Sequence, residues 1–241
     1  MRIVEELKVK PTVILLENVK NFYTHDDGNT FAKVFEELEA AGYCVWNKVL
    51  NTSAITKIPQ NRQRTFLVCF NEGAGPSDPS KKLSWAFKQK FSNIKEVKKT
   101  DSFRKFLEKK EVDPKFFYTK DKSYYIKNTM YGPLKKTMKS KDTVYQWRRV
   151  YVRENKSNEC PTLTANMGTG GHNVPLIITE DNKFRKLTPK ECLLLQGFPK
   201  SYKFPDSVST SQRYKQVGNS VTVPVIKILA KLIKEALDSR K

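Results

Sequence analysis

The residues with the clearest chemical potential are one carboxylate and two closely spaced arginines. Glu17 directly follows a continuous apolar run at residues 12–16. Such a run predicts a strand buried on both faces of a parallel sheet, and open α/β sheets hold their ligand crevice at the carboxyl ends of these strands. Glu17 is therefore a candidate site residue. Arg62 and Arg64 each carry a guanidinium fork that can grip a phosphate or a carbonyl group at two points.

The elements that would position these residues follow from the spacing of apolar side chains. Residues 30–41 repeat apolar positions at helical spacing, with Thr30 as the expected N-cap and Gly42 as the C-terminal stop. Residues 43–50 and 65–70 have the composition of strands. The sequence thus predicts strand, helix, strand, strand around the candidate residues.

The second half of the chain has fewer clear periods. A Gly/Pro/Ser cluster at residues 71–77 indicates a boundary, and a block of interleaved lysines and aromatics without a period follows it. Residues 145–153 alternate in a β-like pattern with one strongly cationic face. Thr188 begins a capping box, and Pro224 opens a last helix with one apolar stripe.

Composition narrows the class of protein. The chain has 241 residues, 38% of them hydrophobic, and a formal net charge of +20. That charge suggests a polyanionic partner such as nucleic acid, although lysine richness can also reflect an AT-rich genome, so charge alone does not decide. No run has the ~18 apolar residues of a membrane span, which predicts a cytoplasmic protein.

The cysteines and histidines give no sign of a metal centre. The four cysteines are scattered without a Cys-x-x-Cys pair, and the two histidines are far apart in the sequence. This spacing argues against a zinc site and against a disulfide framework. We expect no metal, and we expect the cysteines to be small buried residues.

Four segments resemble, in order, the carboxy-terminal motifs of bacterial DNA cytosine-5 methyltransferases. They are residues 15–22 (LLENVKNF), 58–66 (IPQNRQRTF), 185–199 (RKLTPKECLLLQGFP) and 209–221 (STSQRYKQVGNSV). Each segment alone is modest evidence, but their order and the variable basic block between the second and third are specific to the family. The resemblance covers nearly all of the chain except residues 73 to about 140.

The resemblance implies an α/β fold with two parts. One is part of a Rossmann-like sheet of S-adenosylmethionine-dependent methyltransferases, and the other is a smaller, mixed, β-rich DNA target-recognition domain. The expected boundaries are residues 1–72 for the catalytic part, 73–207 for the recognition domain, and 208–241 for a return segment whose helix packs on the catalytic part.

The resemblance also implies roles for single residues. In the family, a cysteine thiolate adds to carbon 6 of a cytosine flipped out of the duplex, and the glutamate matching Glu17 donates a proton or hydrogen bond to N3. Arg62 and Arg64 match the pair that contacts the flipped nucleotide. Residues that match the S-adenosylmethionine pocket are Asn219, Ser220 and Val221, with Gly218 expected to allow close backbone approach.

Further residues are candidates for contact with double-stranded DNA. They are Gln60, Arg148, Arg149, Arg153, Thr162 and Thr164. For each of the three arginines a solvated strand face is nearly as good an interpretation as a base or phosphate contact. The glycine-rich residues 168–172 fit either a phosphate-binding loop or a plain hairpin loop.

Two motifs of the family do not occur in the sequence: the Phe-x-Gly-x-Gly cofactor loop and the Pro-Cys-Gln loop with the nucleophile. Cys160-Pro161 has the reversed order and lies in the recognition region. The expectation is therefore the carboxy-terminal half of a restriction-modification type methyltransferase, either a split subunit or a fragment, that needs an amino-terminal partner. The alternatives are a DNA-binding specificity or regulatory protein that has lost catalysis, and a generic basic RNA-binding protein.

Overall fold

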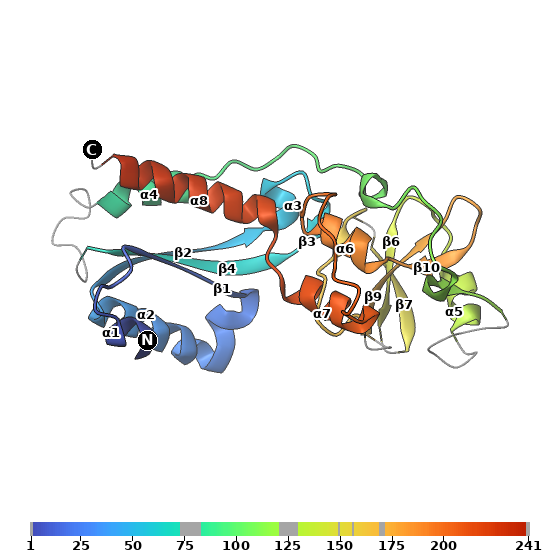
Figure 1. The fold of residues 1–241 in the computed structure, drawn as a ribbon, viewed down its shortest axis with the longest axis horizontal. Coiled ribbons are helices and arrows are strands. Elements are labelled where there is room, and N and C mark those ends of the chain that lie inside the picture. The colour runs from blue at the N-terminus through green and yellow to red at the C-terminus, as the bar shows by residue number, and fades with distance from the viewer. Residues whose placement is uncertain are drawn as a thin grey trace. The chain divides into compact units, whose positions relative to one another are not determined.

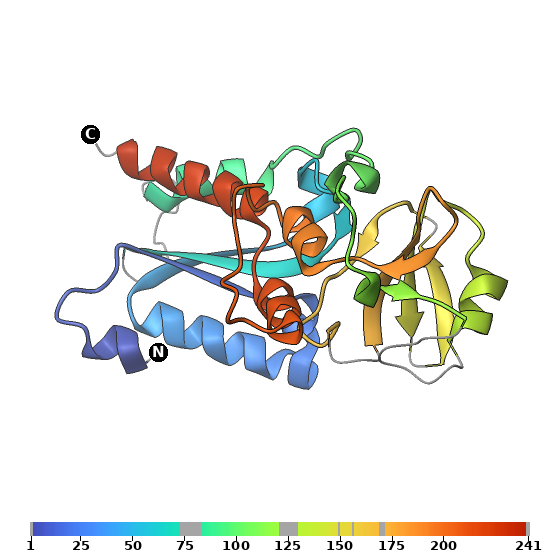
Figure 2. The same cartoon turned by 45° about the vertical axis from the view of Figure 1, so that its right-hand side comes forward.

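The computed structural model describes residues 2–72, 83–120, 130–148, 150–155, 157–168 and 172–239. The chain divides into two compact units (Figures 1 and 2). The first unit comprises Met1–Asn51, Gln63–Glu96 and Ile226–Lys241, and the second comprises Thr52–Arg62 and Val97–Val225. The short segment Thr52–Arg62, which lies within the predicted catalytic part, thus groups with the second unit.

The first unit contains a three-stranded sheet in the order β1-β4-β2, formed by β1 (Val13–Val19), β4 (Gln63–Asn71) and β2 (Tyr43–Asn51). The predicted strands at 43–50 and 65–70 are confirmed. The prediction of a parallel, doubly buried strand at 12–16 is wrong in two respects, because β1 is antiparallel to β4 and only partly buried. Among the described residues β1 has a neighbour on one side only, so its backbone edge and several side chains stay accessible.

The helices of this unit are α1 (Arg2–Glu6), η1 (Lys20–Gly28), α2 (Asn29–Ala40), α4 (Leu83–Ser92) and most of α8 (Val223–Asp238). Helix α2 was predicted with Thr30 as N-cap, but Gly28 occupies the N-cap, and the Thr30 hydroxyl lies 2.7 Å from His25 Nδ1. Gly42 follows the helix with a φ of +92°, as its predicted role as a stop requires.

Helices cover both faces of this sheet (Figure 1). Side chains on a strand alternate between faces. Accordingly, Cys69 of β4 joins the buried cluster under α2, whereas its neighbour Phe70 packs against Phe87 of α4 with ring centroids 5.2 Å apart. An ion pair of 2.6 Å between Lys90 and Glu235 connects α4 to α8. Both faces of β4 are therefore packed, and within the described residues β1 and β2 are the two edge strands, of which β1 is the more exposed.

The second unit is built on a five-stranded antiparallel sheet in the order β5-β10-β9-β6-β7. The strands are β5 (Phe117–Tyr118), β10 (Phe184–Lys186), β9 (His172–Ile178), β6 (Val144–Arg148) and β7 (Tyr151–Asn155). A separate parallel pair joins β3 (Gln60–Asn61) to β8 (Cys160–Pro161). The helices are α3 (Thr52–Ile55), η3 (Phe103–Phe106), η4 (Pro114–Phe116), α5 (Tyr131–Thr137), α6 (Pro189–Leu195) and α7 (Thr210–Asn219).

The β-like stretch predicted at 145–153 is two strands of a hairpin, not one. The chain turns between Arg148 and Tyr151, which face each other in the register, so the alternation changes phase at the turn. Trp147 and Val152 are consequently buried on one face, while Gln146 and Arg153 lie directly opposite each other on the other face. A single strand at 145–153 would place Arg153 and Trp147 on the same face, whereas the hairpin places them on opposite faces.

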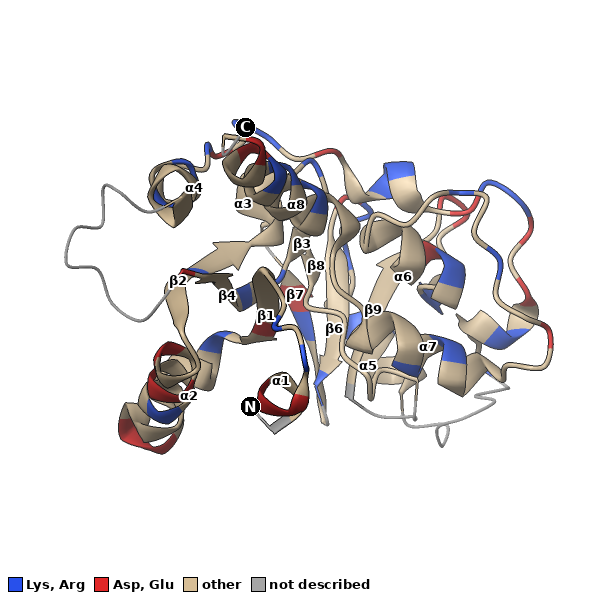
Figure 3. Ribbon diagram, turned by 60° about the vertical axis from the view of Figure 1, so that its left-hand side comes forward, with Lys and Arg blue, Asp and Glu red and all other residues tan. Residues whose placement is uncertain are grey.

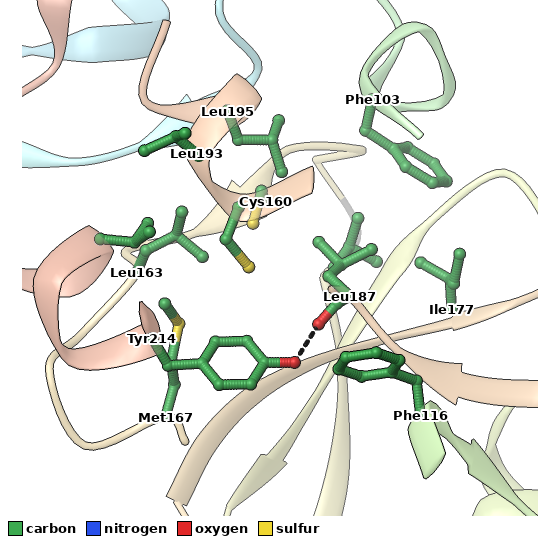
Figure 4. Packing of buried hydrophobic residues seen from close by; sticks show 13 residues of the cluster. Phe103, Phe116, Cys160, Leu163, Met167, Ile177, Leu187, Leu193, Leu195 and Tyr214 are labelled. Carbon is green, nitrogen blue, oxygen red and sulfur yellow. Dashed lines mark hydrogen bonds between the residues drawn. The ribbon is translucent and has the colours of Figure 1, made fainter. Parts of the chain in front are cut away.

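The core of the second unit joins α6 and α7 to the strands. Tyr214 of α7 points into this cluster, and its hydroxyl donates a hydrogen bond to the carbonyl of Leu187 (Figure 4). The predicted capping box of α6 is confirmed, because the Thr188 hydroxyl accepts from the Glu191 amide at 3.1 Å and the Glu191 carboxylate accepts from the Thr188 amide at 2.8 Å. The Tyr214 contacts hold α7 against this core, and α7 ends at Asn219, one of the predicted cofactor residues. In the described part of the chain no helix has the length and apolarity to cross a membrane.

Candidate active site

Glu17 and Arg64 form an ion pair on the sheet of the first unit. Arg64 Nε lies 2.9 Å from Glu17 Oε1, and the two side chains are 16% and 27% exposed, respectively. Arg64 faces Val19 in the antiparallel register, and Val19 shares a strand face with Glu17. The two residues are thus diagonal neighbours on one face. The structure brings together two side chains that the sequence placed 47 positions apart.

The surroundings of Arg64 favour a fixed cation beside the carboxylate. Burial lowers the pKa of Arg64, while the charge of Glu17 and their hydrogen bond raise it. An arginine remains protonated in either case, because its ordinary pKa is far above neutral pH. Arg64 Nη1 also donates to the carbonyl of Gln63 at 2.8 Å, which restricts the orientation of the guanidinium. Glu17 is therefore held in place by a charged and oriented partner.

Arg62 has different surroundings. Its side chain is 4% exposed and lies inside the second unit. Nη1 donates to the carbonyl of Leu163 at 2.9 Å, and Nη2 donates to the carbonyls of Ser220 at 2.8 Å and Gly218 at 3.4 Å. The guanidinium thus connects the backbone of two distant segments. Its predicted contact with a flipped nucleotide stays a prediction.

Gln60 is also directed into the protein. Its side chain is fully buried, its Nε2 donates to the carbonyl of Leu195 at 2.8 Å, and its Oε1 accepts from the Leu163 amide at 3.3 Å. A buried amide with both ends hydrogen-bonded is satisfied by the fold itself. The predicted DNA contact of Gln60 has no support in this arrangement. No sequence signal distinguishes such a structural amide from one at the surface.

The predicted cofactor residues lie where α7 ends. A Cβ at Gly218 would overlap the backbone of Thr164 and Ala165, so this glycine allows a close approach of the chain's own backbone. That explains Gly218 without the cofactor approach expected from the sequence. The Ser220 hydroxyl donates to the carbonyl of Val217 at 2.7 Å. Asn219 is exposed, and its side chain has no hydrogen-bond partner among the described residues.

Four of the predicted DNA-contacting residues meet around one cavity of about 280 Å³ in the second unit. The cavity is lined by Asn61, Gln146, Arg148, Arg153, Asn155, Pro161, Thr162, Thr164 and Asn173. Among the described residues no carboxylate lines this cavity, although acidic and basic residues occur on many elements elsewhere (Figure 3). Arg149 lies outside the described residues. Arginine, amide and hydroxyl groups without a competing acid suit a phosphate or a base edge.

The cysteines are not placed for nucleophilic chemistry. All four are buried. Burial raises the pKa of Cys69 to about 12 and raises the pKa of Cys160 and Cys192 above the ordinary thiol value. A reactive cysteine needs the opposite shift, because the thiolate is the nucleophile. In the part of the chain that the structure describes, no group of three or more metal-ligating side chains is arranged around a common point.

Comparison with solved structures defines the class of fold. Dnmt2 methyltransferase of S. pombe superimposes with a TM-score of 0.67 at 19% identity, over 98% of this chain and 70% of that chain. A methyltransferase of Entamoeba histolytica gives a TM-score of 0.63 at 17% identity. The fold is therefore the mixed α/β fold of methyltransferases.

Sequence comparison defines the family. The model of the C-5 cytosine-specific DNA methylase family matches residues 1–235, and the chain belongs to this family. Type II methyltransferase M.Bsp6I of Bacillus sp. (strain RFL6) is 45% identical over 229 residues, which are 95% of this chain and 67% of the relative. M.HaeII of Haemophilus aegyptius is 33% identical, over 92% of this chain and 60% of the relative. The chain thus spans about two thirds or less of the length of these relatives.

Proposed function

We propose that the chain is the carboxy-terminal component of a DNA cytosine-5 methyltransferase of restriction-modification type. The observation that carries the proposal is the pair of Glu17 and Arg64, with an oriented carboxylate beside a fixed cation on an accessible sheet face. The family membership and the type II methyltransferases among its relatives support the same activity. The net charge of +20 suits double-stranded DNA as the substrate.

The proposed chemistry assigns Glu17 the proton at N3 of a cytosine flipped out of the duplex. A cysteine thiolate adds to carbon 6, which increases the electron density at N3. Glu17 then transfers its proton to N3. S-adenosylmethionine supplies the methyl group that carbon 5 attacks. A water molecule then takes the proton of carbon 5, the sulfur–carbon bond breaks to release the thiolate, and N3 returns its proton to the Glu17 carboxylate. Arg64 holds the Glu17 carboxyl in place for this transfer.

The thiolate is proposed to come from an amino-terminal partner. The four cysteines of this chain are buried, and the pKa of three of them is raised. The open edge of β1 offers a place for such a partner, since Leu16 and Val19 on this strand are 37% and 51% exposed. An unpaired strand edge with exposed apolar side chains favours pairing with a further strand.

The pocket for S-adenosylmethionine is proposed to include Asn219, Ser220 and Val221. The Asn219 side chain can hydrogen-bond a polar ligand, because this exposed amide has no protein partner among the described residues. The Ser220 carbonyl is less suited, since it already accepts from Arg62. Asn219 is therefore the residue proposed to bind the cofactor through its side chain. No metal is proposed.

The two units correspond, in this proposal, to two functions. The sheet of the first unit belongs to the Rossmann-like catalytic domain, and the antiparallel sheet of the second unit belongs to the target-recognition domain. The cavity lined by Arg148, Arg153, Thr162 and Thr164 supports the second assignment. A DNA-binding protein that has lost catalysis is the rival proposal, since it would retain this cavity without a use for Glu17.

Methyl transfer from labelled S-adenosylmethionine to duplex DNA tests the proposal. The chain alone and the chain with an amino-terminal segment carrying the Phe-x-Gly-x-Gly and Pro-Cys-Gln motifs are compared. We expect transfer only in the mixture. DNA binding without transfer by that mixture would favour the rival proposal, and transfer by the purified chain alone would overturn the need for a partner.

A further inference from the structure

The strand that borders the polar cavity contains a local irregularity at Asn173. In the register between β6 and β9, Gln146 faces Pro175 and Arg148 faces His172, so β9 has one residue more than β6 over this stretch. Asn173 has a φ of +60°, which places it in the left-handed region. Such bulges redirect a side chain, and non-glycine residues with positive φ are concentrated at functional positions. Asparagine tolerates this conformation better than most residues.

The redirected Asn173 side chain completes a hydrogen-bonded group with its neighbours on β6. Arg148 Nη1 donates to Asn173 Oδ1 at 3.1 Å and to Gln146 Oε1 at 3.5 Å. Gln146 Nε2 donates to Asn173 Oδ1 at 3.3 Å, and the Gln146 side chain is buried with 5% exposure. The two amide oxygens thus hold one end of a guanidinium that is itself exposed.

This arrangement leaves the other edge of the Arg148 guanidinium available. Among the described residues, neither Nε nor Nη2 of Arg148 has a protein partner. These two nitrogens form one of the parallel donor pairs that match two acceptors in a plane. A guanine base presents such acceptors, O6 and N7, in the major groove, and arginine is its most frequent specific partner.

We propose that Arg148 reads a guanine of the DNA recognition site, and that Gln146 and Asn173 are positioning residues for it. This inference rests on the proposed function in DNA methylation. Neutral amide oxygens fix the direction of the fork and leave its charge intact, which is what recognition of a planar base edge requires. Arg153 differs, because no described protein group orients its side chain, and it is assigned a contact with the phosphate backbone.

The experiment selects bound duplexes from a pool with randomised sequence, and the 241-residue chain is the binding protein. Wild type is compared with Arg148→Ala, Arg148→Lys, Asn173→Gly and, as the matched control, Arg153→Ala. Asn173→Gly removes the amide but accommodates the positive φ without strain, so it separates the side chain from the backbone. Thermal unfolding of each variant shows whether it remains folded.

We expect Arg148→Ala and Arg148→Lys to reduce the preference for guanine at one position by about 5- to 150-fold, the value of a bidentate contact, with the other positions unchanged. Asn173→Gly should weaken the same preference partly, and Arg153→Ala should weaken all sequences equally. A folded Arg148→Ala chain that keeps every guanine preference overturns the inference alone. Absence of any enriched sequence with the wild-type chain overturns the proposed DNA recognition and the inference with it.

Discussion

Arg64 Nε lies 2.9 Å from Glu17 Oε1, across a strand pair in which Arg64 faces Val19. The contact is diagonal, because Glu17 is two positions before Val19 on the same face of β1. A shift of the register by one residue would separate the two side chains onto opposite faces. The proposed acid and the cation that orients it therefore depend on a single strand pairing.

Replacement of Glu17 by glutamine should affect the chemical step far more than DNA binding. Glutamine keeps the size of the side chain and a hydrogen-bond donor but cannot transfer a proton to N3. Loss of a proton donor typically lowers the rate by about 10²- to 10⁴-fold. Single-turnover methyl transfer and DNA affinity are measured together in the reconstituted enzyme. A near-normal single-turnover rate in the Glu17→Gln enzyme would assign Glu17 a structural role.

Replacement of Arg64 by alanine should reduce both rate and binding of the flipped nucleotide. The change removes the partner of Glu17 and a predicted grip on the nucleotide at once. In a double-mutant cycle with Glu17→Gln, the two effects on the rate should not add, because the residues are in contact. Additive effects of the two changes would show that the ion pair does not couple them during catalysis.

Replacement of Arg62 should destabilise the fold. Alanine leaves the carbonyls of Leu163 and Ser220 without their charged donor in a buried environment. We expect a loss of roughly 3 kcal/mol of stability in urea unfolding of the Arg62→Ala chain. Arg153→Ala, at an exposed position, is the matched control and should unfold like wild type. Equal midpoints of urea unfolding for the two variants would show that Arg62 does not stabilise the fold.

A methyl group at Gly218 should be far less tolerated than one at Gly132. Both glycines lie in helices, where alanine normally stabilises by up to ~1 kcal/mol. At Gly132 no atom lies within 4 Å of the added Cβ, whereas at Gly218 it overlaps the Thr164–Ala165 backbone. Gly218→Ala should therefore lower the thermal midpoint and displace Asn219, and Gly132→Ala should not. Equal thermal midpoints for the two variants would contradict the close contact between Gly218 and the Thr164–Ala165 backbone.

Signals within a few residues were sufficient for the end of α2, for the start of α6 and for the strands β2 and β4. The Thr188 capping box and the stop at Gly42 depend on backbone geometry that adjacent residues determine, and both are confirmed. The strand β1 was predicted to end before Glu17 but continues to Val19, and its predicted parallel pairing was wrong, because an apolar run does not indicate which strand lies beside it. The turn between Arg148 and Tyr151 was missed for a similar reason, since both sides of the hairpin alternate.

The candidate site was predictable in its residue types and less so in its geometry. Motif resemblance singled out both Glu17 and Arg64, and the structure joins them. The inward direction of Arg62 was not predictable, because its acceptors lie more than 100 positions along the chain. The positive φ of Asn173 was missed as well, since a bulge depends on the register of the strand beside it.

Covalent trapping on a duplex that contains 5-fluorocytosine tests the central claim most directly, since fluorine at carbon 5 prevents release of the thiolate. The chain is incubated with this duplex and S-adenosylmethionine, alone and with the amino-terminal segment, and the linked cysteine is mapped by mass spectrometry. We expect no adduct with the chain alone, and in the mixture an adduct on the cysteine of the added segment. An adduct on Cys44, Cys69, Cys160 or Cys192 would contradict the claim that this chain supplies Glu17 but not the nucleophile.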